Sequence, residues 1–219
     1  MKKLLALTFI TVLLSCSGGD DTPTNPNNPD LNPTPTTYTL GGIGPGGGRI
    51  FYLDASGHGL EVTGVIGTYK WGNLPRNPQT QFLVPVPALG VAIGTGKDNT
   101  TKIVNHIGNN NGEPYAAKIC DDFIQNDKDD WYLPSREELY SMLHFFKYEH
   151  PIPDFFSINE SIWSSSHDIN DSADPNPYNS TPLVNVWSTD WHTQDYYWRQ
   201  HLYIESPLMT LNVRAIRNF

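Results

Sequence analysis

The chain has 219 residues, and its 14 basic and 23 acidic side chains give a formal net charge of −9 at pH 7. Basic surfaces bind nucleic acids and other polyanions, so this charge argues against such partners. The only cysteines are Cys16 and Cys120, too few for a thiolate zinc site.

The first fifteen residues predict export. Lys2 and Lys3 precede an apolar run, residues 4–14, that is shorter than the roughly 20 residues needed to span a bilayer. This pattern is typical of a signal peptide, and its end, Leu-Leu-Ser-Cys, resembles the lipobox of bacterial lipoproteins. We expect Cys16 to carry lipid and to anchor the protein in the bacterial outer membrane, exposed at the cell surface. An ordinary secretory signal with a chance cysteine is the alternative.

Residues 16–37 are rich in proline, asparagine and threonine, which predicts a disordered tether. Asp20 and Asp21 resemble the acidic export signal of surface lipoproteins, although a solvated linker would carry such charges too. Loss of Lys2 and Lys3 with the signal peptide leaves 12 basic and 23 acidic residues, a net charge of −11. The 182 residues from 38 to 219 are enough for one globular domain.

The first part of this domain predicts a hairpin and then two helices. Residues 48–54 and 59–66 are rich in β formers and flank a turn, whereas residues 67–96 have no periodicity and are predicted to be irregular. Apolar residues then recur at helical spacing in 97–108 and 113–126. The second helix should point Cys120 inward, as a small buried side chain.

The stretch Asp-Asp-Trp-Tyr-Leu-Pro-Ser-Arg-Glu-Glu-Leu, residues 129–139, predicts a short strand at 131–133 followed by a helix. Ser135 and Glu138 have the spacing of a capping box, in which each side chain satisfies the other residue's backbone N–H. Glu137 and Glu138 also complement the positive end of the helix dipole. We therefore interpret both glutamates as structural rather than catalytic, and expect the helix to end before Pro151.

The final third predicts strands at 161–166, 183–187, 196–205 and 209–219, the last two joined by a turn at 206–207. A polar loop, residues 167–182, separates the first two of these strands. Its oxygen-bearing side chains, at Asp168, Asn170, Asp171 and Asp174, are compatible with calcium. The pattern lacks the glycine and the final glutamate of an EF-hand, and Asx turns are the simpler explanation. No other cofactor and no further metal site is predicted.

Aromatic side chains are densest between residues 187 and 203. Strand alternation places Tyr197, Arg199 and His201 on one face, where rings mix with hydrogen-bonding groups as they do in sugar sites. A second layer of core is the alternative. We predict that the unusually long insertion at 167–195 and the strand after it form a ligand-binding face. Its predicted residues are Trp187, Trp191, His192, Tyr197, Arg199 and His201.

Five segments together resemble one family: GPGGGRIFYLD, AIGTGKDNTTKIV, AAKICDDFIQNDKDDWYLPSREEL, IWSSS and VRAIRNF. They are similar to a bacterial exported domain family, long of unknown function, typified by the C-terminal domain of a collagen-like surface adhesin. The resemblance implies an α+β, C-type-lectin-like fold, with a twisted, mostly antiparallel β core flanked by two to three helices and long irregular loops. It supplies no catalytic residues. Asn73 stands where many members have a cysteine, and the acidic charge argues against the sulfated polysaccharide that the adhesin binds.

We therefore interpret the chain as a surface-anchored lipoprotein binding module that recognises glycan or a host or matrix surface. A carbohydrate-active hydrolase that uses an acid pair is the second hypothesis, and a structural subunit of the cell envelope without a small ligand is the third. Neither a nucleophile elbow nor a reactive cysteine is found, which favours binding over catalysis. The expected partners are the membrane, through the lipid, and a glycan or surface ligand, but no nucleic acid.

Overall fold

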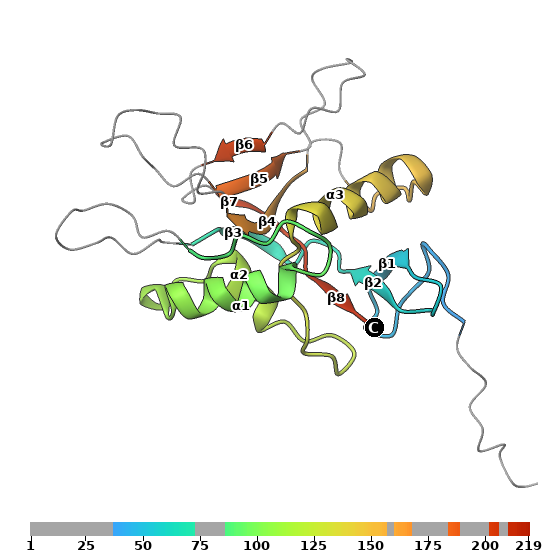
Figure 1. The fold of residues 1–219 in the computed structure, drawn as a ribbon, viewed down its shortest axis with the longest axis horizontal. Coiled ribbons are helices and arrows are strands. Elements are labelled where there is room, and N and C mark those ends of the chain that lie inside the picture. The colour runs from blue at the N-terminus through green and yellow to red at the C-terminus, as the bar shows by residue number, and fades with distance from the viewer. Residues whose placement is uncertain (1–36, 73–85, 157–159, 168–183, 189–201, 206–209) are drawn as a thin grey trace, which may run out of the picture. The chain divides into compact units, whose positions relative to one another are not determined.

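The computed structural model describes residues 37–72, 86–156, 160–167, 184–188, 202–205 and 210–219. Within these residues it is a mixed α+β domain, as predicted, with helices packed against two small sheets (Figure 1). The helices are α1 (Gly96–Ile107), α2 (Ala116–Asp121) and α3 (Arg136–His144). The strands are β1 (Arg49–Leu53), β2 (Gly59–Val62), β3 (Gly67–Lys70), β4 (Ser161–His167), β5 (Val184–Ser188), β6 (Leu202–Glu205), β7 (Thr210–Val213) and β8 (Ile216–Asn218).

The first sheet has the strand order β1-β2-β8, and both of its pairings are antiparallel. The β1–β2 hairpin is the one that the sequence predicts. β8 joins it from a distant part of the sequence, with Leu60 opposite Asn218 and Val62 opposite Ile216. The sheet therefore brings the start and the end of the described residues side by side (Figure 1).

The second sheet has the order β3-β7-β4-β5-β6 and is antiparallel except between β4 and β7. Two predictions are wrong here. Residues 67–70, predicted to be irregular, form β3, which pairs with β7. The predicted single strand 209–219 is interrupted at Arg214 and Ala215, and its halves, β7 and β8, belong to different sheets. β6 and β7 are also not neighbours, because β4 and β5 lie between them.

The predicted helices are present. The bounds of α1 agree with the prediction to within one residue, whereas α2 ends at Asp121, five residues earlier than expected. Cys120 is free and fully buried, as predicted, and burial raises the pKa of its thiol well above the usual value. The predicted strand at 131–133 is reduced to one bridge, between Tyr132 and Ile216. The capping box at the start of α3 is confirmed.

Strand β4 lies between two hydrophobic cores. Successive side chains of a strand point to opposite faces, so Trp163 packs with α1 and α2 while Ile162 packs with α3 and the hairpin. The segment before α3 divides in the same way, because Leu133 belongs to the first core and Tyr132 to the second. The second core packs α3 against Phe51 of β1 and Ile162 of β4.

The Val-Arg-Ala-x-Arg motif is explained by two buried ion pairs. Arg214 forms a fork with Glu160, with nitrogen–oxygen distances of 2.7 and 3.0 Å. Arg217 binds Glu61 at 2.8 Å and Asp130 at 2.6 Å. The Arg217 hydrogen bond holds the pKa of Asp130 below its usual value. The motif joins β7 and β8 to distant acidic residues, since a buried charge is tolerated only when it is paired.

The glycine-rich segment before β1 wraps around the carboxylate of Glu61. The backbone N–H groups of Gly46 and Gly48 donate to the two oxygens of Glu61, at 2.8 and 2.7 Å. Successive N–H groups in such a loop form an anion-binding concavity. Here the anion is a side chain of the protein itself.

Candidate functional site

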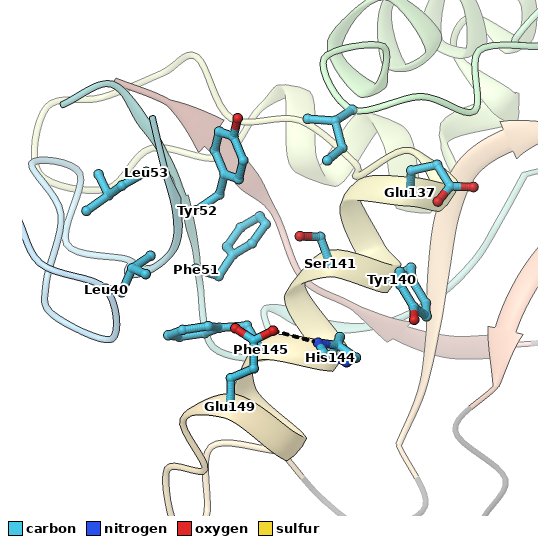
Figure 2. Close-up of a pocket in the computed structure, with 11 residues that line it drawn as sticks. Leu40, Phe51, Tyr52, Leu53, Glu137, Tyr140, Ser141, His144, Phe145 and Glu149 are labelled. Carbon is cyan, nitrogen blue, oxygen red and sulfur yellow. Dashed lines mark ion pairs between the residues drawn. The ribbon is translucent and has the colours of Figure 1, made fainter. Parts of the chain in front are cut away.

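A pocket of about 440 Å³ lies between β1 and α3 (Figure 2). We call it the helix pocket. Figure 2 shows Phe51 between the strand and the helix, and Ser141 directed from α3 toward it. Its size is typical of sites for small ligands. Its lining combines aromatic and aliphatic side chains with hydrogen-bonding groups.

A β-bulge directs two neighbouring aromatic side chains into this pocket. Successive side chains of a regular strand face opposite ways, yet Phe51 and Tyr52 both line the helix pocket. The β1–β2 register shifts between Ile50 and Tyr52, which allows this arrangement. Phe51 is buried at the base, whereas Tyr52 is 40% exposed. Bulges of this kind commonly redirect a side chain beside a functional site.

A π-helical turn, Phe145–Glu149, continues α3 and shapes the other end of the pocket. Its wider turn closes with a 2.7 Å hydrogen bond from His150 N to Phe145 O. The turn brings His144 and Glu149, five residues apart, within 2.9 Å (Figure 2). An ordinary helix aligns residues three or four apart, so this pair depends on the π turn, a feature that is frequent at functional sites.

The loop at residues 90–95 forms the third wall and is tied firmly to the start of α3. Ser135 Oγ donates to Ala92 O at 2.9 Å, and Gly94 N donates to Glu138 Oε1 at 2.8 Å. These contacts present Ile93 at the pocket edge, where it is 46% exposed. The capping-box residues therefore have a second role, which is to hold a wall of the pocket.

Glu138 is fully buried beneath this wall. Its carboxyl group accepts the N–H groups of Ser135 and Gly94 and lies 3.3 Å from the Tyr132 hydroxyl. Burial raises the pKa of Glu138 above its usual value, since these hydrogen bonds offset only part of the lost hydration. The Tyr132 hydroxyl also donates to Asn218 Oδ1, and it has only one proton to give. The hydroxyl therefore cannot donate to Glu138 and Asn218 at the same time.

The two surface carboxylates of the helix pocket are both paired. Glu137 lies 3.1 Å from the Arg136 guanidinium, and Glu149 contacts His144.

Within the residues that the structure describes, no three His, Cys, Asp or Glu side chains gather in a way that could hold a metal ion. No helix in that part of the chain is long and apolar enough to cross a membrane. The lining of the helix pocket presents aromatic rings and hydrogen-bonding groups.

The predicted ligand-binding face falls mostly outside the described residues, so it stays a prediction. Trp187 lies in β5, where its backbone is opposite Ile162 of β4 and Leu202 of β6. The other predicted residues lie outside the described residues: Trp191, His192, Tyr197, Arg199 and His201. Cys16 and the predicted calcium loop at 168–174 also lie outside them.

The helix pocket was not predicted from the sequence. Its residues come from Leu40, β1, the loop at 90–95, α3 and the π turn, and no short motif joins them. One signal was present, namely the run Ile-Phe-Tyr-Leu at 50–53, which breaks the alternation expected of a half-exposed strand. Such a run indicates a bulge or a strand that is covered on both faces.

Comparison with known proteins adds no relative. No protein-family model matches the chain. No curated protein matches its sequence either. The resemblance to the adhesin domain family therefore stays a prediction, and the function has to be argued from the site.

Proposed function

We propose that this protein is a surface-anchored lipoprotein binding module that recognises glycan through the helix pocket. The supporting observation is the pocket's lining, in which the Tyr52 ring and Ile93 lie beside Ser141, His144 and Glu149. Sugars are bound by stacking on rings and by hydrogen bonds that fix orientation. The bulge and the π turn that shape this lining are local departures from regular structure, and both border the same pocket.

The finer fold assignment, C-type-lectin-like, is part of this proposal. A mostly antiparallel β core, helices packed against it and the pairing of β2 with β8 support it. Cys16 is proposed as the lipid anchor, with residues 17–37 as a tether that holds the domain away from the outer membrane. The aromatic segment at 187–201 is proposed as an additional ligand face, because its residue types suit the same chemistry.

A glycan array tests the proposal. We expect the full chain to bind uncharged oligosaccharides, and Tyr52→Ala to weaken binding by more than about 1 kcal/mol, as loss of an aromatic anchor does. Ile93→Ser should weaken binding as well. Ile124→Ser is the matched control, because Ile124 is 68% exposed and lies outside the helix pocket.

The outcomes separate the hypotheses. Equal losses for Ile93→Ser and Ile124→Ser would contradict a role for the helix pocket. Loss with Trp191→Ala alone would move the site to the predicted aromatic face. Release of shorter sugars during the assay would favour the hydrolase, and absence of binding to every glycan would favour a structural role in the cell envelope.

A further inference from the structure

A second pocket adjoins the helix pocket along β1. It has a volume of about 430 Å³ and lies between the β1–β2 turn and β8, and we call it the strand pocket. Tyr52 and Ile93 line both pockets. The two pockets are therefore adjacent, with these two exposed side chains between them, and we call the two pockets together the groove.

The strand pocket presents a fixed acceptor and a fixed donor. Asp54 Oδ1 accepts the N–H groups of Ser56 at 2.8 Å and His58 at 3.0 Å, which orients its carboxylate. Asn218 Oδ1 accepts the hydroxyl of Tyr132 from the core, so its amide N–H groups are left for the pocket side. A carboxylate accepts and an amide N–H donates, and together they suit a pair of hydroxyl groups.

The charges of the groove select against ionic ligands. No lysine or arginine among the described residues lines either pocket, whereas three carboxylates and two imidazoles do: Asp54, Glu137, Glu149, His58 and His144. A sulfate or phosphate would meet carboxylates without a cation. Each carboxylate already has a partner, namely N–H groups and His58, Arg136 or His144, so an ammonium group gains little. The groove thus suits an uncharged ligand rich in hydroxyl groups.

We propose that the groove binds an extended, uncharged glycan chain whose units fill the helix pocket and the strand pocket together, with Tyr52 and Ile93 against the unit at the junction. This inference rests on the proposed function and names the ligand class for the same site. Asp54 and Asn218 orient the unit in the strand pocket, and Ser141 contacts the unit in the helix pocket.

The arrangement requires affinity to depend on chain length. One sugar unit fills one pocket. A longer chain also gains the contacts of the second pocket, and it does so without a second loss of translational and rotational freedom. The wall at residues 90–95 is held by the contacts of Ser135 and Glu138, so little further ordering of this wall opposes binding. Affinity should therefore rise with length and level off once both pockets are filled.

Titration calorimetry on the full chain tests this with three uncharged series of one to six units: β-1,4-linked glucose, α-1,4-linked glucose and β-1,4-linked N-acetylglucosamine. We expect at least about a tenfold gain from the shortest to the longest member of one series. Asn218→Asp keeps an acceptor for Tyr132 but removes the donors, and should cut the long-chain affinity roughly fivefold. Ser141→Ala should do the same from the helix pocket. Asn212→Asp, on β7 and outside both pockets, is the control.

The results separate this inference from the proposed function. Equal affinity at all lengths, or an unchanged length dependence in both Asn218→Asp and Ser141→Ala, overturns the two-pocket ligand while glycan recognition stands. If heparin or oligolysine binds more tightly than every neutral series, the assignment of an uncharged glycan as the ligand is wrong. Failure of every glycan to bind contradicts the proposed function, and this inference with it. A melting temperature equal to that of the wild type confirms that each variant is folded.

Discussion

His144 Nδ1 lies 2.9 Å from Glu149 Oε1, across a turn that is wider than an ordinary helical turn. The pair closes one end of the helix pocket and holds the imidazole beside the rings of Tyr140 and Tyr148. Because both side chains are partly exposed, the pair serves to position groups rather than to stabilise the fold.

Glu149→Gln should therefore weaken oligosaccharide binding and leave stability almost unchanged. We expect roughly a fivefold loss of affinity, the value of about one hydrogen bond, and a change in unfolding free energy below about 1 kcal/mol. Calorimetry and urea denaturation measure the two quantities. Asp98→Asn is the control, since Asp98 forms a similarly exposed pair with Lys102 on α1. Equal affinity losses in the two variants would contradict the positioning role.

Glu138→Gln should destabilise the domain and change its pH dependence. An amide cannot accept both buried N–H groups, which costs about 1–3 kcal/mol. Burial raises the pKa of Glu138 above 4.5, so the folded state keeps a proton that the unfolded state has lost. The stability that this group contributes is full below pH 4.5 and is lost as pH rises through the folded-state pKa.

The wild-type advantage over Glu138→Gln should thus shrink from pH 4 toward pH 8 in urea denaturation. Asp130, whose pKa is lowered, has the opposite dependence, but it is present in both proteins and cancels in the difference. An advantage that grows with pH would show that the hydrogen bonds to Ser135 and Gly94 outweigh burial.

Arg214→Met should cost about 3–5 kcal/mol of unfolding free energy, because it removes the guanidinium fork from the buried Glu160 carboxylate. The double variant Arg214→Met/Glu160→Met should recover much of that loss, since both charges of this buried pair are then removed. Urea denaturation of the two variants measures both. If the double variant is as unstable as the single one, the contacts of Arg214 with Thr63 O and the Phe156 ring carry the stability instead.

Gly46→Ala should destabilise the protein by about 1–3 kcal/mol, as overpacking does. A Cβ atom there would lie 2.7 Å from Glu61 Oε1 and 2.8 Å from atoms of Arg217 and Trp131. Gly64→Ala is the control, because a Cβ at Gly64 has open space around it. Thermal unfolding compares them, and equal melting temperatures would mean that the loop around Glu61 yields without cost.

Cys16→Ala should move the protein from the membrane fraction to the soluble fraction, because the proposed anchor is a lipid on that thiol. Mass spectrometry of the wild type should show the acyl chains. A variant that stays with the membrane, together with a wild type that lacks acyl mass, would reject the lipoprotein assignment.

The parts of the fold that depend on local chemistry could be predicted. The Ser135 and Glu138 capping box, the β1–β2 hairpin and the inward side of α2 follow from spacing, turn residues and helical period. Each needs only a few neighbouring residues to be recognised.

The parts of the fold that depend on partners far away in the sequence could not be predicted. The split of 209–219 into β7 and β8 follows from the ion pairs of Arg214 and Arg217, whose partners lie far away in the sequence. The helix pocket arises where β1 and α3 leave their regular periods, and period-based reasoning has no means of placing such departures. The aromatic segment after Trp187 was the stronger signal in composition, and it remains to be tested.

The pairing of β2 with β8 also governs when the domain can fold. Glu61 and Arg217 are separated by 156 positions, so the first sheet closes only after nearly the whole domain has been synthesised. Pairing of segments that lie far apart in the sequence slows folding. Until Arg217 has been synthesised, compaction would bury the Glu61 carboxylate without its guanidinium partner. The first sheet therefore cannot close around Glu61 before the last residues of the domain are available.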